Sequence, residues 1–290
     1  MNVLIGTPCA GGQVSVQYLM SYVGMLGDCI RAGIKPLLYT LSQESLLPRG
    51  RNHLAQRAMM QKCDKLFFID ADTGWSPQDF ISICKSPFPI CAGLVPLKVY
   101  PTVYNYVPYK EDDKYFKHNL RTPEATLKMR NAYNMSEIPV AFTGTAFLCI
   151  DSQVLYKLSE NTPTYQYPDP FTGEVSTHWD FFGGGPMFDT YYSEDWAFCE
   201  KARKVGYDIR VNFDIKLNHV GFHLYRGNGI MNIDQVPEAF RDILYRLQNS
   251  REEDILNIVK ILKDIVPGDR PGTNIMSPRA DVARAPEVIQ

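Results

Sequence analysis

The stretch KLFFIDADTGW, residues 65–75, runs from a continuous apolar segment into two aspartates that are one residue apart. The apolar run after Lys65 predicts a strand that is buried on both faces, as in a parallel sheet covered by helices on both sides. In open parallel sheets, ligands gather at the carboxyl ends of the strands. Asp70 and Asp72 lie at such an end. Because alternate residues of a strand point the same way, both carboxylates should face one site.

Two carboxylates on one side of a strand end repel each other, and a cation beside them relieves that repulsion. Hard oxygen ligands suit Mg²⁺ or Mn²⁺, and such ions commonly complete their coordination with substrate phosphates. The alternative is a turn, in which Asp72 starts an Asx-turn before Gly74 and Asp70 caps a backbone amide. The pair by itself leaves both interpretations open.

Outward from this stretch, residues 2–75 alternate between strand and helix. Strands are predicted at 2–8 and 35–42, with helices at 14–33 and within 47–63. This order predicts an α/β fold, with a mostly parallel mixed sheet flanked by helices. Residues 100–135 and 160–192 lack a clear period and are predicted to be an excursion and a long glycine-rich loop. Further helices are predicted at 76–86, 152–160 and 193–206, and further strands at 89–96, within 139–151 as a strand pair or hairpin, and at 208–219.

The composition excludes several classes of protein. The formal net charge is −2, with 45% hydrophobic residues, so a sizeable core is expected and no polyanionic partner is required. Seven cysteines occur without a CxxC motif, which favours buried thiols in a reducing compartment over a zinc site. The amino terminus is unlike a signal peptide, and no apolar run reaches the length of a membrane span. We therefore expect a soluble cytoplasmic protein, in the host cytoplasm if the protein is viral.

Several segments, in order, resemble the glycosyltransferases of the GT-A fold, which use a nucleotide-activated sugar and a divalent metal. The D-x-D of FFIDAD is the signature of that family. The resemblance covers residues 2–225 and is greatest for small viral and bacterial members whose metal site includes a late histidine. The matching segments are IGTP (5–8), PRGRNHLAQRAM (48–59), FFIDAD (67–72), FTGTAFLCI (142–150) and SEDWAFCEKARKVGYDI (193–209).

The resemblance implies a site for Mn²⁺ or Mg²⁺. Asp72 would ligate the metal directly, and Asp70 would approach the metal or the ribose of the donor. His219, which ends a late predicted strand, would be the third protein ligand. His223 is the competing histidine, and a structural role is the alternative for both.

The resemblance also assigns roles to the acidic pair in SEDW. Asp195 would be the general base that removes the proton of an acceptor hydroxyl, and Glu194 would orient or bind the acceptor. In a retaining enzyme no such base is required, and the carboxylate would bind acceptor or sugar instead. The alternative is that both acids only stabilise a helix N-terminus.

The donor is expected to be a nucleotide sugar, with a UDP-sugar favoured. Arg49 and Arg51 would meet the diphosphate or order the loop, unless they form a solvated helix start. Trp179 belongs to a glycine-rich segment, 179–185, that either closes over the sugar or packs its aromatic rings inward. The full set of predicted donor contacts is Thr7, Pro8, Ala10, Arg49, Arg51, Asp70, Gly144, Thr145 and Trp179.

The predicted domain organisation is a GT-A-like domain over residues 1–225, with a nucleotide-binding half (1–100) and an acceptor half (101–225). Two amphipathic helices over 226–266 and a flexible tail over 267–290 follow it. The helices either pack on the main domain or form a homo-oligomer or partner contact.

The predicted function is metal-dependent transfer of a sugar to a hydroxyl acceptor, which is a glycan, a lipid, a metabolite or a modified DNA base. One alternative is a sugar-phosphate nucleotidyltransferase, but TPCAGGQVS (7–15) lacks the basic residue that such enzymes carry after the first strand. The other is a non-catalytic module that binds nucleotide sugars.

Overall fold

The computed structural model describes residues 1–42, 44–99, 102–108, 122–168, 173–187, 190–221 and 224–226. The chain divides into two compact units, Met1–Ile233 and Asp234–Gln290, and the fold below belongs to the first. The predicted C-terminal helices and tail, from residue 227 onward, lie outside the described residues, as does His223.

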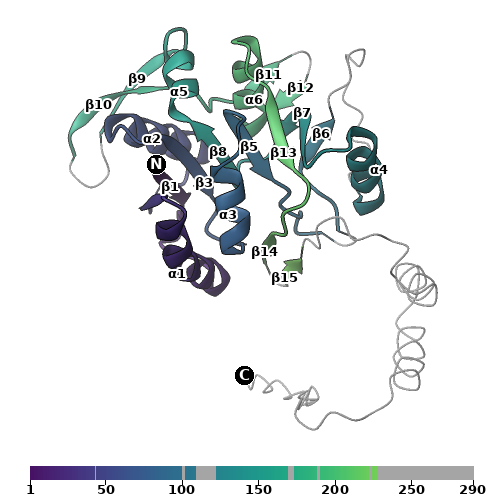
Figure 1. Cartoon of the computed structure of the whole chain (residues 1–290). Coiled ribbons are helices and arrows are strands. Elements are labelled where there is room, and N and C mark those ends of the chain that lie inside the picture. Colours follow the sequence, from purple (N-terminus) through teal and green to yellow (C-terminus); the bar gives the residue numbers. More distant parts are fainter. Residues whose placement is uncertain are drawn as a thin grey trace, which may run out of the picture. The chain divides into compact units, whose positions relative to one another are not determined.

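An eight-stranded sheet forms the centre of this unit, in the order β2-β1-β3-β8-β5-β13-β7-β6 (Figure 1). Within this sheet β7 and β8 run against the other strands, so the sheet is mixed but mostly parallel in direction. The predicted α/β class is confirmed. The strands are β1 (Asn2–Pro8), β2 (Lys35–Leu41), β3 (Lys65–Ile69), β5 (Ile90–Gly93), β6 (Tyr106–Pro108), β7 (Glu137–Thr143), β8 (Phe147–Asp151) and β13 (Ile209–Asn212).

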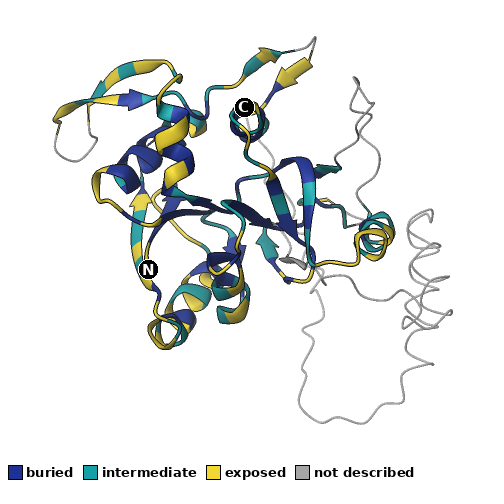
Figure 2. Ribbon diagram, turned by 45° about the horizontal axis from the view of Figure 1, so that its top comes forward, coloured by how far each residue is buried: buried dark blue, intermediate teal, exposed yellow. Residues whose placement is uncertain are grey.

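Helices cover both faces of the sheet, and the apolar run of β3 contributes to both cores. Leu66 and Phe68 pack with α2, α5 and α6, whereas Phe67 and Ile69 pack with α1 and α3. Burial on both sides is the reason that this strand has no polar face, and Figure 2 shows the central strands as buried. The helices are α1 (Val16–Arg31), α2 (Leu47–Met60), α3 (Pro77–Cys84), α5 (Ser152–Ser159) and α6 (Glu194–Lys204).

Of the strand pair or hairpin predicted within 139–151, both strands form, but they do not pair with each other as a hairpin would. β7 pairs with β13 and β6, and β8 pairs with β3 and β5. The chain between them, Gly144 to Ala146, therefore crosses the sheet rather than reversing within it. This crossing places a glycine-bearing turn near the carboxyl ends of β3 and β5.

The two segments without clear periodicity contain regular structure that the sequence patterns did not indicate. The excursion holds β6 and a helix, α4 (Pro123–Tyr133), which Thr122 caps at its N-terminus. The long loop holds two hairpins. Their strands are short and mostly exposed, so no long apolar alternation marks them. The hairpin strands are β9 (Thr164–Pro168) with β10 (Val175–Trp179), and β11 (Gly185–Met187) with β12 (Thr190–Tyr192).

A small three-stranded sheet completes the fold and is built next to the aspartate pair. It consists of β4 (Thr73–Gly74), β14 (Asn218–Val220) and β15 (Leu224–Arg226), in the order β15-β14-β4. All seven cysteines are buried and free, as predicted. In the described part of the chain, no helix combines the length and the apolar character needed to span a bilayer.

Candidate functional site

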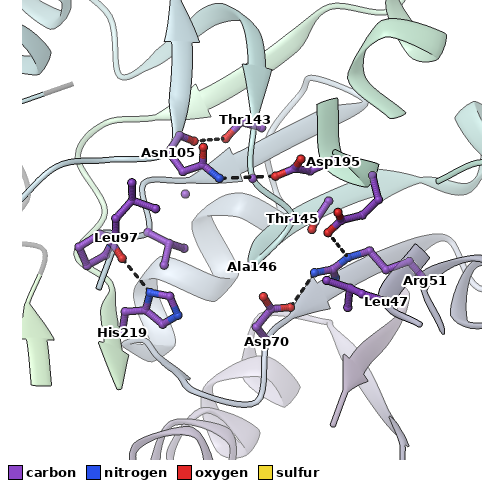
Figure 3. A pocket seen from close by; sticks show the side chains of 15 residues that line it. Leu47, Arg51, Asp70, Leu97, Asn105, Thr143, Thr145, Ala146, Asp195 and His219 are labelled. Carbon is purple, nitrogen blue, oxygen red and sulfur yellow. Dashed lines mark hydrogen bonds and ion pairs between the residues drawn. The ribbon is translucent and has the colours of Figure 1, made fainter. Parts of the chain in front are cut away.

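Two cavities lie at the carboxyl end of β3, and both are lined by Leu47 and Asp70. The smaller, of about 160 Å³, is lined from β3, the turn between β7 and β8, and the start of α6 (Figure 3). The larger, of about 450 Å³, is lined mainly by the loop after β1. Among the predicted site residues, the smaller cavity is lined by Arg51, Asp70, Gly144, Thr145, Glu194, Asp195 and His219, and the larger by Pro8, Ala10, Asp70 and Asp72.

Asp72 and His219 come together because β4 pairs with β14. The register places His219 opposite Thr73, and the Val220 N–H donates to the Asp72 carbonyl at 2.8 Å. Because a carbonyl can only accept, His219 Nδ1 donates to the Pro96 carbonyl at 2.8 Å, and Nε2 lies 3.3 Å from Asp72 Oδ1. Metal-binding histidines usually hold their second nitrogen in this way. The pair therefore offers one nitrogen and one carboxylate oxygen to a cation.

Lys98 forms an ion pair with the second oxygen of Asp72. Burial would raise the pKa of Asp72, but the hydrogen bonds and charges of His219 and Lys98 outweigh it and lower the pKa to about 2. Among the described residues, no three His, Cys, Asp or Glu side chains are grouped so as to hold a metal ion. Of the predicted metal ligands, the structure brings Asp72 and His219 together and leaves Asp70 with a different partner.

That partner is Arg51, whose side chain is only 1% exposed. Its Nη2 lies 3.0 Å from Asp70 Oδ1 (Figure 3), its Nε lies 3.7 Å from Glu194 Oε1, and its guanidinium lies over the ring of Phe68. Its Nη1 is buried and has no hydrogen-bond partner among the described residues. One buried cation thus joins the end of β3 to the start of α6 and balances two carboxylates.

Glu194 and Asp195 open α6 in different environments. Burial and the charge of Asp195 raise the pKa of Glu194. Asp195 Oδ1 accepts hydrogen bonds from the Ser193 hydroxyl and from the Trp196 N–H, the latter at 2.8 Å. Among the described residues, its Oδ2 accepts only a long bond of 3.5 Å, from Asn105 Nδ2, beside the smaller cavity. Local bonds therefore orient one oxygen, while the other remains close to the cavity.

Gly144 allows the turn between β7 and β8 to lie against Asn105. Its N–H donates to the Asn105 carbonyl at 3.2 Å, and a Cβ at this position would lie 2.6 Å from Asn105 Nδ2. Thr145, next in the chain, is buried and also lines the smaller cavity. A larger residue at position 144 would push Asn105 away, so the glycine helps to keep Asn105 within reach of Asp195.

Two predicted donor contacts, Thr7 and Trp179, line neither cavity. Thr7 is fully buried and shares a hydrogen bond with the Tyr18 hydroxyl, because β1 carries it into the interior of the sheet. Trp179 packs against the core and stacks on Phe181 with ring centroids 6.0 Å apart. Phe181 and Phe182 are fully buried. The aromatic rings of 179–185 therefore pack inward rather than forming a lid over the sugar.

Arg49 is also directed away from the cavities, because it is bound to a carboxylate outside them. Its Nε and Nη2 donate to Glu44 at 2.7 and 2.9 Å, and its guanidinium lies over the ring of Tyr167 at 4.7 Å. Arg49 and Arg51 both belong to α2. Of these two arginines, only Arg51 lines a cavity of the site.

Replacing Glu44 with glutamine should lower the free energy of unfolding by about 1 kcal/mol near neutral pH. Burial would raise the pKa of Glu44, but hydrogen bonds, led by that from Arg49, outweigh burial and lower the pKa. Such a group stabilises the fold above its unfolded-state pKa of about 4.3, and the stabilisation disappears as pH falls through the folded-state value. Denaturant titrations of both proteins at pH 7 and pH 3 should show that E44Q has the lower free energy of unfolding, and that the difference from wild type is smaller at pH 3. The same difference at pH 7 and pH 3 would contradict the role of the charged pair.

The sequence patterns point to neither Lys98 nor Asn105. Lys98 follows the predicted strand at 89–96. Its one distinguishing feature in the sequence is that it is the single basic residue between Pro96 and Pro101. Asn105 belongs to an aperiodic segment and carries no such signal. Both residues reach the site because the chain returns alongside itself, with Pro96 bridged to Tyr104.

No protein-family model matches the chain, and a search of curated proteins found no match. Similar solved structures include "A197 from STIV", at 14% identity and a TM-score of 0.44, with 79% of this chain and 95% of that chain covered. They also include "GalNAc-T7 with UDP, GalNAc and Mn2+", at 12% identity and a TM-score of 0.47. This match covers 79% of this chain and 44% of that chain. The similar structures thus include a viral protein and a glycosyltransferase, and likeness of this degree does not establish what this chain binds.

Proposed function

We propose that this chain is a divalent-metal-dependent glycosyltransferase that transfers a sugar from a nucleotide-sugar donor, with a UDP-sugar favoured, to a hydroxyl acceptor. The observation that carries the proposal is the Asp72–His219 pair. His219 Nε2 and Asp72 Oδ1 face each other at 3.3 Å at a sheet edge beside two cavities. Because Nδ1 donates to Pro96, these two atoms attract each other only through a cation, which is a proton on Nε2 or a metal ion that replaces it. The nitrogen and oxygen ligands suit Mn²⁺ or Mg²⁺.

On the donor side, the larger cavity would hold the nucleoside, with Pro8 and Ala10 in its wall. Asp72 and His219 would hold the metal, and Asp70, fixed by Arg51, would approach the ribose or the metal. A metal bound there supplies charge that compensates the nucleoside diphosphate as it leaves. The sugar would extend into the smaller cavity along the backbone of Gly144 and Thr145.

On the acceptor side, Asp195 would accept the proton of the attacking hydroxyl through Oδ2. Ser193 and the Trp196 N–H hold the other oxygen, so the carboxylate is oriented before the acceptor arrives. Glu194 would bind an acceptor or sugar hydroxyl. Its raised pKa fits a buried group close to other carboxylates at a binding site.

Substitution of Asp72 by asparagine tests the proposal. Purified wild-type protein with Mn²⁺ should be stabilised against thermal unfolding by at least one nucleotide sugar of a panel, and should slowly hydrolyse it. D72N should lose Mn²⁺-dependent stabilisation, and its turnover should fall by about 10²–10³-fold, because the developing charge on the diphosphate is no longer compensated.

The outcomes separate this function from its alternatives. Stabilisation by a nucleotide sugar with no turnover, in both wild type and D72N, would indicate a binding module. Release of pyrophosphate from a nucleoside triphosphate and a sugar phosphate would indicate a nucleotidyltransferase. If no nucleotide sugar stabilises the protein and Mn²⁺ has no effect, the proposed function is wrong.

A further inference from the structure

Residues 96–99 and 102–105 contact both sides of the site. The two stretches lie side by side, since Pro96 bridges to Tyr104 and the Leu97 N–H donates to the Val103 carbonyl at 2.8 Å. At one end, the Pro96 carbonyl fixes His219. At the other end, Asn105 reaches Asp195. Lys98 belongs to the first stretch and is bound to Asp72.

The Lys98–Asp72 ion pair uses the carboxylate that the proposed function assigns to the metal. Lys98 Nζ is on Oδ2 and His219 Nε2 faces Oδ1, so protein groups contact both carboxylate oxygens. Asp72 and His219 are held by the register between β4 and β14. The Lys98 side chain is 38% exposed, and its partner is 36% exposed. A long side chain with this exposure can leave its partner without any rearrangement of the sheet.

We infer that Lys98 is a built-in counter-cation that competes with the divalent metal for Asp72. A metal on Oδ1 and the ammonium group on Oδ2 would place two cations on one carboxylate, where they repel each other at short range. Metal binding therefore favours departure of the ammonium group from Oδ2, and Mn²⁺ alone should bind weakly. This inference rests on the proposed function, because it takes Asp72 as a metal ligand.

The displaced ammonium group requires a new anionic partner, and the diphosphate of the donor supplies one. A metal that brings the diphosphate to Asp72 brings it to Lys98 as well. Nucleotide binding should therefore strengthen metal binding, and by linkage the metal should strengthen nucleotide binding by the same factor. Lys98 thus couples the two ligands and disfavours a metal-loaded site that lacks a donor.

The test measures Mn²⁺ affinity of the full chain by calorimetry, first alone and then with saturating UDP. Lys98→Met keeps the length of the side chain and removes the charge. Lys128→Met, on the exposed surface of α4, is the matched control for loss of one positive charge. Without UDP, K98M should bind Mn²⁺ roughly threefold to tenfold more tightly than wild type. The gain in affinity that UDP gives should be smaller in K98M, and K128M should match wild type in both measurements.

Each other outcome overturns the inference in a distinguishable way. If wild type binds Mn²⁺ and K98M binds it no more tightly than K128M does, Lys98 does not compete and the proposed function stands. If no variant binds Mn²⁺ with or without UDP, the metal-dependent function fails together with the inference. Thermal unfolding of the three proteins without metal verifies that each is folded.

Discussion

Replacing Asp195 with asparagine should lower the rate of sugar transfer by about 10²–10⁴-fold, because this substitution removes the proposed general base without changing its shape. Asp195 is buried at the start of α6, and its Oδ2 lies beside the smaller cavity, 3.5 Å from Asn105 Nδ2. An amide at this position can keep the bonds from Ser193 and the Trp196 N–H by presenting its oxygen to them. It cannot accept a proton from a hydroxyl.

The measurement is kcat and KM with a saturating nucleotide sugar, supported by Mn²⁺-dependent donor binding as a separate readout. D195N should bind donor and metal as wild type does, since none of the proposed donor ligands is changed. The matched control is Ser193→Ala, which removes one orienting bond and should cost far less in rate. A loss below about tenfold in D195N would contradict the role of a base, and would favour a retaining reaction in which the carboxylate only binds substrate.

Replacing Arg51 with methionine should lower the free energy of unfolding by roughly 3 kcal/mol near neutral pH, since it leaves partly buried carboxylates uncompensated. Arg51 is 1% exposed and contacts Asp70 and Glu194 from one guanidinium group. Asp195 adds a third negative charge beside them. For a chain of this size the melting temperature should fall by roughly 6–12 °C.

The pH dependence separates lost charge from lost packing. Arg51 lowers the pKa of Glu194 against the raising effects of burial and Asp195, so its removal should raise that pKa further. A carboxyl with a raised folded-state pKa destabilises the fold at higher pH, and the cost is relieved as pH falls through that value. The stability deficit of R51M should therefore shrink between pH 7 and pH 5.

Two controls accompany R51M. Arg31→Met removes an exposed surface pair with Asp28 and should cost at most about 1 kcal/mol. Arg51→Lys should be more stable than R51M but less stable than wild type, because an ammonium group lacks the planar set of N–H donors with which a guanidinium contacts two carboxylates. A deficit in R51M that is the same at pH 7 and pH 5 would show that packing, and not charge balance, is the contribution of Arg51.

The strand at Lys65–Ile69 and the helix at Pro77–Cys84 could be predicted from the sequence because their signals are local. An unbroken apolar run marks a strand that is buried on both faces, and Ser76 with Asp79 forms a capping box at the helix start. The sequence did not allow prediction of the hairpins within 160–192 or of the helix at Pro123–Tyr133, because these elements are short or mostly exposed.

Some residues of the candidate site could likewise be predicted from the sequence, whereas the contacts of others could not. Asp70, Asp72, Asp195 and His219 could be picked out because each lies at the end of a predicted strand or at the start of a predicted helix, where local pattern and chemistry coincide. Arg49 and Arg51 are two residues apart on one helix and look equivalent in the sequence. Only the packing of α2 shows that Arg49 binds Glu44, whereas Arg51 lies buried between Asp70 and Glu194.

The sequence by itself determined the α/β class, the buried strand that ends in Asp70 and Asp72, and the acidic start of α6, since these depend on periodicity and capping along the chain. The tertiary structure decided which of these groups meet. The pairing of β4 with β14 brings His219 to Asp72, and the bridge between Pro96 and Tyr104 brings Lys98 and Asn105 to opposite ends of the site. Contacts between distant segments depend on which strands pair and where the chain reverses, and both are decided by packing across the whole fold.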